Sequence, residues 1–140
     1  MKKILVPTDV SEHSRRALNV ALELARKFNA EVELLFVVAD RVIYSFGEAD
    51  SYVASSEQVE KEGELALKAM LEGIDISGIT LNKKTLHGNP SKVILQEVEN
   101  EAIDLVVMGS HGYGAVVGSV LGSVSQKVLH GARCAVLIAK

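Results

Sequence analysis

Four short apolar runs stand far apart in the chain, and they predict the strands of a buried sheet. The runs are rich in Val, Ile and Leu and barely alternate between apolar and polar residues, apart from Glu33 in the second run. Strands that are covered on both faces have this pattern, so we expect interior parallel strands. The runs span residues 4–6, 32–38, 105–108 and 135–139.

The segment between the first two runs predicts an amphipathic helix. Apolar residues recur at a three–four spacing from Ala17 to Phe28. Ser11 or Ser14 is the expected N-cap, and Asn29 marks the C-terminal end. Together with its flanking strands, this helix predicts a βαβ unit.

Two further helices have recognisable first turns. Asn89 and Pro90 supply an N-cap and a proline at the first helical position, and that helix should end near residue 100. Ser123 and Gln126 have the spacing of a capping box, with Ser123 as the cap, ahead of a short helix that Gly131 ends.

Strands and helices alternate along the whole chain, which predicts a doubly wound open parallel α/β sheet with helices on both faces. Residues 79–86 are more polar and are expected to form the third strand, at a sheet edge. Residues 39–56 are the exception: we expect an irregular segment there, either a mobile lid or a loose crossover into a helix around 59–70. No domain boundary is evident, so residues 1–140 are interpreted as one domain.

Composition narrows the possible partners. A net charge of −3 gives no general attraction to nucleic acid or to anionic lipid. Only three apolar residues precede Pro7, too few for a signal peptide or a membrane span, so we expect a cytoplasmic protein. The single cysteine, Cys134, adjoins an apolar run and is expected to be buried and inert.

Glycines gather directly after the apolar run 105–108, which is the expected fourth strand. Nine residues separate Gly109 and Gly112 from Gly122 and Ser123, counted from Gly112, and Gly122 and Ser123 stand at the start of the short helix. Such spacing lets backbone amides wrap around an anion, with phosphate as the first candidate. Ligands of open α/β sheets bind beyond the carboxyl ends of the strands. Asp9 lies at that end of the first strand. An acid on one side and phosphate-binding amides on the other suit an adenine nucleotide.

Each of these features also has a purely structural interpretation. The glycines could serve only a sharp turn, Asp9 could form an Asx turn or a helix cap, and Ser123 could simply cap its helix. His13 and His130 are interpreted as surface residues of helices. No spacing indicates a protein metal site or a catalytic dyad, so any Mg²⁺ (or Mn²⁺) would arrive on the phosphates of the nucleotide.

The pattern G-x2-G-x9-G-[S/T], together with Pro7-Thr8-Asp9 after the first strand, resembles the ATP-binding branch of the universal stress protein family. The resemblance covers essentially the whole chain. It implies the strand order 3-2-1-4-5, ATP in the crevice between the first and fourth strands, and homodimers.

Carried over position by position, the resemblance also implies a set of binding residues. Adenine and ribose would contact Pro7, Thr8, Asp9 and Val38, while Met108 and Gly109 would meet ribose and phosphate. His111 is a further expected phosphate contact. The triphosphate would lie on Gly112, Gly122, Ser123, Val124 and Ser125.

Other nucleotide folds fit less well. The spacing Gly112-x-Gly114-x3-Gly118 resembles a dinucleotide-binding fingerprint but follows the wrong strand. The sequence also contains no Walker-type Gly-Lys-Ser or Gly-Lys-Thr. Two functions remain: a regulatory or stress-response module that holds ATP, or a slow ATP hydrolase stimulated by a partner. We favour the module and no enzyme activity, because no general base is evident. The apolar last strand, residues 135–139, is expected to pair across a homodimer.

Overall fold

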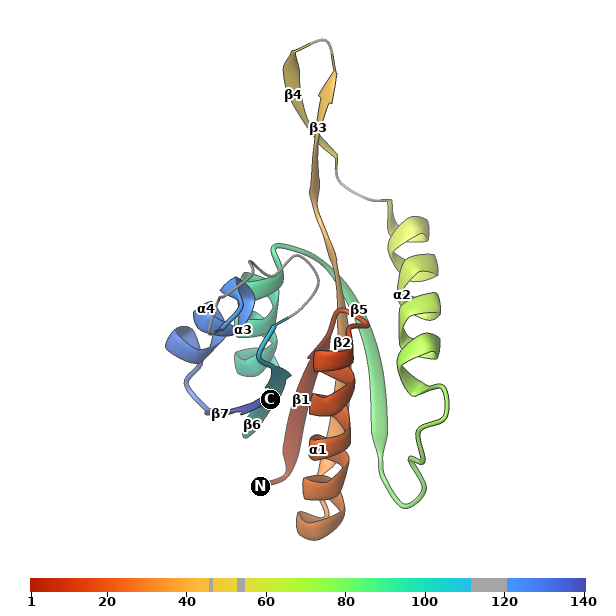
Figure 1. The fold of residues 1–140 in the computed structure, drawn as a ribbon, viewed down its shortest axis with the longest axis vertical. Coiled ribbons are helices and arrows are strands. Elements are labelled where there is room, and N and C mark those ends of the chain that lie inside the picture. Colours follow the sequence, from red (N-terminus) through yellow and green to blue (C-terminus); the bar gives the residue numbers. More distant parts are fainter. Residues whose placement is uncertain (46, 53–54, 112–120) are drawn as a thin grey trace.

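A parallel sheet of five strands forms the centre of the molecule (Figure 1). The computed structural model describes residues 1–45, 47–52, 55–111 and 121–140. The strand order is β5-β2-β1-β6-β7, which is 3-2-1-4-5 when the strands of this sheet are numbered along the chain. The predicted fold class and strand order are thereby confirmed. The strands are β1 (Lys3–Thr8), β2 (Glu31–Ala39), β5 (Leu81–Gly88), β6 (Leu105–Gly109) and β7 (Ala135–Ala139).

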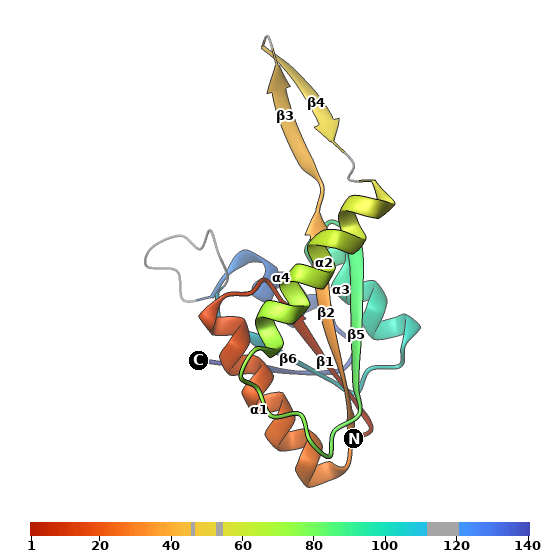
Figure 2. The same ribbon diagram turned by 90° about the vertical axis from the view of Figure 1, so that its right-hand side faces the viewer.

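Helices cover both faces of this sheet (Figure 1, Figure 2). Helices α1 (Glu12–Phe28) and α2 (Ser56–Leu71) pack on one face, and α3 (Pro90–Asn100) and α4 (Ser123–Gly131) pack on the other. Neighbouring residues of β2 therefore point into different cores: Leu34 packs beneath α1 and α2, and Leu35 beneath α3 and α4. Burial on both sides explains why the strands read as nearly continuous apolar runs.

The predicted ends of α1 and α3 agree with the structure. The Ser11 side chain caps α1 by accepting from the Ser14 amide, and Asn29 ends the helix with a left-handed φ of 53°. Asn89 caps α3, and Pro90 occupies its first turn. These side chains make local hydrogen bonds whose partners are fixed by spacing along the chain, so the sequence is sufficient to find them.

The expectation of an irregular segment over residues 39–56 is wrong. Strands β3 (Arg41–Ser45) and β4 (Glu48–Tyr52) pair antiparallel as a two-stranded sheet that projects from the body (Figure 2). Ser45 pairs with Glu48 across the turn, where Gly47 has a φ of 79°. Antiparallel pairing satisfies the backbone groups between the two strands, so this connection needs no cover from the core.

The predicted capping box at Ser123 is also wrong. The N-cap of α4 is Gly122, and no side chain accepts a hydrogen bond there. The capping box instead lies at the start of α2, where Ser55 and Gln58 bond reciprocally. Among the described residues, no helix is both long and apolar enough to cross a membrane.

The face that α3 covers also buries charge. Glu97 of α3 is 3% exposed and accepts a hydrogen bond from Lys84 of β5, whose ammonium also lies 3.3 Å from Glu101. Glu33 of β2 faces this cluster, and its Oε1 atom is buried with no hydrogen-bond partner among the described residues. Burial, followed by the neighbouring Glu97 carboxyl, raises the pKa of Glu33 from 4.5 to about 7.

Candidate functional site

Side-chain hydrogen bonds close the turn from β1 into α1. The Thr8 hydroxyl donates to the Ser14 hydroxyl and accepts from the Val10 amide, both at 3.0 Å. One carboxylate oxygen of Asp9 accepts from the Ser11 amide at 3.0 Å and from the Ser14 hydroxyl at 3.2 Å. Asp9 therefore forms the Asx turn that the sequence left open, and it holds the turn at the carboxyl end of β1.

Val10, in the middle of this turn, adopts a φ of 67°. A β-branched residue rarely occupies this left-handed region, because its side chain crowds the backbone. Such strain persists where the surroundings fix it, and it concentrates at functional sites. Here the Thr8 hydroxyl holds the Val10 amide, so the turn is fixed beside the end of the strand.

The end of β6 approaches α1 so closely at Gly109 that no side chain fits between them. A Cβ atom at this position would lie 2.7 Å from the backbone carbonyl carbon of His13 and 2.8 Å from its oxygen. Glycine is required here for close packing. The contact sets the end of β6 against the first turn of α1, next to the turn that Asp9 holds.

Hydrogen bonds attach the start of α4 to the same place. The Gly122 amide donates to the Ser110 carbonyl at 2.8 Å, and the buried Ser125 hydroxyl donates to the Gly109 carbonyl at 2.9 Å. The first amides of a helix have no partner within the helix, and the helix dipole places partial positive charge at that end. The N-terminus of α4 therefore offers hydrogen-bond donors beside the carboxyl ends of the strands, where an anion fits.

The sequence and the fold of the chain can be compared with those of known proteins. The family model described as "Universal stress protein family" matches residues 1–140. The chain belongs to the universal stress protein family. A universal stress protein of Methanocaldococcus jannaschii is 34% identical over 139 residues, which covers 99% of this chain and 82% of that protein.

Solved structures of universal stress proteins share the fold. The protein UspA from Lactobacillus plantarum superposes with a TM-score of 0.72 at 22% identity, covering 99% of this chain and 97% of that one. A universal stress protein in complex with cAMP gives a TM-score of 0.70 at 20% identity, covering 99% and 97%. One from Archaeoglobus fulgidus in complex with dAMP gives 0.65 at 18% identity, covering 100% and 98%.

The structure of this universal stress protein brings most of the expected binding residues to the carboxyl ends of β1 and β6. Pro7, Thr8, Met108, Gly109 and Ser125 are buried there, Asp9 is half-buried, and Ser123 is exposed at the start of α4. Val38 is buried near the end of β2, and Val124 is half-buried in α4. Gly112 lies outside the described residues.

Gly122 has an ordinary extended backbone conformation. Its φ of −66° and ψ of 159° are open to any residue, so a positive φ is not the reason for glycine at this position. A side chain at this position would stand at the N-terminus of α4. The ligand contact expected of Gly122 therefore stays a prediction about close approach.

Sequence reasoning named His111 as a binding residue but missed its pairing with His13 at this crevice. His13 of α1 and His111, two residues after β6, place their ring centroids 5.5 Å apart. His13 Nδ1 also lies 2.8 Å from an Arg16 guanidinium nitrogen, and His111 Nδ1 lies 3.1 Å from the Ser110 hydroxyl. His13 is thus more than a surface residue. No sequence signal links two residues that only the close approach at Gly109 brings together.

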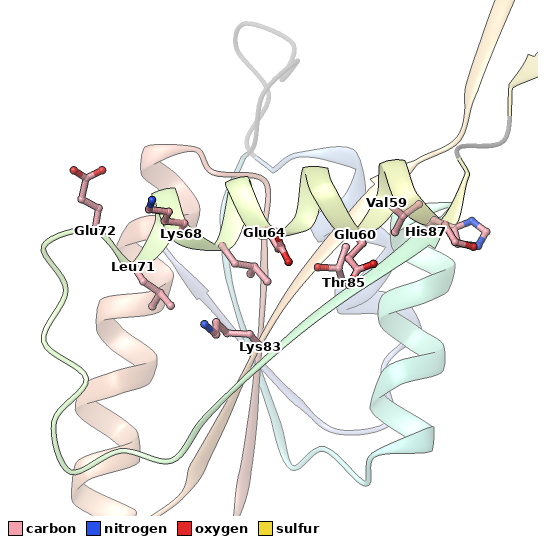
Figure 3. Close-up of a pocket in the computed structure, with 11 residues that line it drawn as sticks. Val59, Glu60, Glu64, Lys68, Leu71, Glu72, Lys83, Thr85 and His87 are labelled. Atoms are coloured by element: carbon pink, nitrogen blue, oxygen red, sulfur yellow. The ribbon is translucent and has the colours of Figure 1, made fainter.

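A separate groove of about 970 Å³ lies between α2 and β5 (Figure 3). None of the expected nucleotide-binding residues lines it. Its lining combines apolar and charged side chains and includes Val59, Glu60, Glu64, Lys68, Lys83 and Thr85. Within the described part of the chain, no three His, Cys, Asp or Glu residues are grouped so that they could hold a metal ion.

Proposed function

We propose that this protein binds an adenine nucleotide, ATP in the first instance, at the crevice between the carboxyl ends of β1 and β6. The observation that carries the proposal is the anchoring of α4: the Gly122–Ser110 and Ser125–Gly109 hydrogen bonds hold a helix N-terminus against the carboxyl end of β6. That helix end supplies amide donors for phosphate. The cAMP and dAMP complexes of structural neighbours support an adenine ligand.

The side chains of the crevice determine how the ligand would be held. The hydroxyls of Thr8 and Ser125 already bond within the protein, so they shape the site and leave phosphate recognition mainly to backbone amides. Asp9 is half-buried just after β1, and we expect its carboxylate to accept a hydrogen bond from a ribose hydroxyl. Mg²⁺ (or Mn²⁺) would come with the nucleotide, held by phosphate oxygens and water.

We propose that nucleotide occupancy regulates contacts with a partner protein, and that the chain is not primarily an enzyme. The paired imidazoles of His13 and His111 favour slow ATP hydrolysis as a second candidate, because an imidazole is a common general base. Release of inorganic phosphate from Mg-ATP separates the two functions. Release that is abolished in both His13→Ala and His111→Ala would establish the hydrolase.

We also propose a homodimer through β7. This strand is the last of the sheet, and Val136, Leu137 and Ile138 are only partly buried in the single chain. A twofold axis beside β7 would pair two identical apolar edges antiparallel and cover them. Sedimentation equilibrium at micromolar concentration should give twice the chain mass of 15.0 kDa. Ile138→Pro should weaken the dimer, and a monomer in the unmodified protein would rule it out.

The nucleotide proposal is tested by releasing any copurified nucleotide with denaturant and identifying it by chromatography. Adding the same nucleotide to the stripped protein should raise its stability by about 2.7 kcal/mol at a hundredfold excess over the dissociation constant. The absence of both a released adenine compound and a thermal shift at millimolar Mg-ATP would reject the proposal.

A further inference from the structure

The groove between α2 and β5 lies at an outer edge of the sheet (Figure 3). Lys83, Thr85 and His87 of β5 line it with side chains that alternate along the strand. Helix α2 packs close to the strand at Gly63, where a Cβ atom would lie 2.6 Å from Thr85 Cβ. The groove therefore lies beside a close contact between α2 and β5. It follows β5, which is the edge strand of the sheet.

The backbone amides and carbonyls of the same three β5 residues point outward from the sheet edge. The Val32 amide donates to the Thr80 carbonyl at 2.9 Å, and Val32 lies in register with Leu81. In a parallel ladder, alternate residues make both of their bonds to one neighbour, so the even-numbered residues of β5 bond to β2. The amides and carbonyls of Lys83, Thr85 and His87 consequently point away from β2, where the described sheet has no further strand.

The groove also carries charges that the fold does not use. Among the described residues, no ion pair is recorded for Glu60, Glu64, Lys68 or Lys83. Figure 3 shows Glu60 and Glu64 nearer the start of α2 than Lys68 and Lys83. A third carboxylate of the lining, Glu72, lies beyond Lys68 at the end of α2, and its side chain points away from Lys83. Leu67 adds an apolar surface to the lining. Between α2 and Lys83 the groove thus places two carboxylates nearer the start of the helix and two ammonium groups nearer its end, with apolar side chains among them.

We propose that this groove binds an extended segment of another protein, which pairs with β5 as an additional strand. The free amides and carbonyls of β5 provide backbone hydrogen bonds, and alternate side chains of the added strand fill the groove. Charge complementarity specifies that segment: a basic residue near Glu60 and Glu64, an apolar residue near Leu67, and an acidic residue near Lys68 and Lys83.

A second copy of this chain fits the edge poorly. Lys83 and Lys84 are adjacent in β5, and twofold pairing of two β5 strands about these positions sets ammonium groups opposite one another. Lysines on an edge strand oppose such self-pairing. The groove therefore favours a partner of different sequence. Its proposed binding does not depend on the nucleotide crevice.

The probe is a displayed library of random nine-residue peptides, selected on the full chain. Enriched peptides should alternate in side-chain type and carry a basic and an acidic residue on the same face. In NMR hydrogen exchange, binding should slow the amides of Lys83 and Thr85. N-methylation of one alternate set of peptide amides should abolish binding, while methylation of the other set leaves it unchanged, which also gives the strand orientation.

Two variants of the chain test the mechanism. Lys83→Pro removes an outward amide that the fold does not use, and should weaken binding about fivefold or more, as expected for one backbone hydrogen bond. Lys68→Glu should weaken binding of the same peptides, whereas Lys61→Glu, on the same helix but outside the groove lining, should not.

Failure to enrich any peptide would overturn the proposal. So would enriched peptides that bind equally well to wild type, Lys83→Pro and Lys68→Glu, since they would be bound elsewhere. Peptides that protect the amides of β7 instead would show that the other sheet edge is the one that takes an added strand.

Discussion

The nucleotide crevice and the α2–β5 groove are built in opposite ways. At the crevice, the polar side chains of Thr8, Ser14 and Ser125 bond to the protein itself, and the donors left over belong to the backbone at the start of α4. In the groove, the charges of Glu60, Glu64, Lys68 and Lys83 have no ion pairs among the described residues, and the strand edge is open. The first arrangement suits a small anion, and the second suits a polypeptide.

Both recesses nevertheless depend on a glycine that allows a helix and a strand to approach. Gly109 lets β6 meet the first turn of α1, and Gly63 lets α2 meet β5. The obstacle differs: a Cβ at Gly109 would meet the backbone of His13, whereas a Cβ at Gly63 would meet the side chain of Thr85. The two sites can therefore be disturbed separately.

The largest effect should come from Gly109→Ala. The added methyl would displace α1 from β6, so we expect a loss of about 1–3 kcal/mol in the free energy of unfolding together with weaker nucleotide binding. Urea denaturation and calorimetry measure the two effects. Gly63→Ala is the matched variant: it should cost similar stability but leave nucleotide affinity unchanged. Equal loss of affinity in both variants would show that the recesses are not independent.

Gly122→Val should act on the ligand with little effect on the fold. Valine can adopt the observed φ of −66°, but its side chain would stand at the helix end where phosphate binds. We expect affinity for Mg-ATP to fall at least about tenfold, a cost of 1.4 kcal/mol, with an unchanged urea midpoint and unchanged peptide binding. Wild-type affinity in this variant would place the phosphates elsewhere.

Glu33→Gln should change stability while leaving both recesses intact. The pKa of Glu33 is raised to about 7 in the folded protein, so folding favours its protonated form. Its contribution is complete below pH 4.5 and is lost as the pH rises through 7. Glutamine cannot ionise, so the variant should be more stable than wild type by about 1–2 kcal/mol at pH 8. Urea unfolding at pH 5 and pH 8 measures this, and an identical pH dependence in both proteins would contradict it.

The smallest effect should come from Ser125→Ala. Losing the buried bond to the Gly109 carbonyl should cost about 1 kcal/mol of stability and loosen α4. Ser123→Ala is the control, because Ser123 is exposed and makes no capping bond, so its change should stay within about 0.5 kcal/mol. If the two variants are equally stable, the Ser125 bond does not anchor the helix.

The features that could be predicted from the sequence are those that depend on interactions between residues close together in the chain. The ends of α1 and α3 were predictable, since Ser11 and Asn89 cap the amides three residues ahead. The strand order was predicted from the resemblance to the universal stress protein family, and the structure confirms that order. The β3–β4 pair was missed because two strands that pair only with each other need not alternate like strands on a core.

The candidate site shows the same limit. The grouping of its residues could be predicted, because Asp9 lies just beyond the apolar run 4–6 and Gly109 directly follows the run 105–108. The pairing of His13 with His111, the strain at Val10 and the groove beside β5 could not. Each depends on how closely two elements pack in three dimensions, and a single sequence does not record this distance.

The most direct test of nucleotide binding at the crevice is an NMR titration of the ¹⁵N-labelled protein with Mg-ATP. The amides of Asp9, Ser123 and Val124 should shift together and saturate at one nucleotide per chain, while those of Lys83 and Thr85 in the groove should remain still. Shifts confined to the groove, or no saturable shift at millimolar Mg-ATP, would contradict the proposed site.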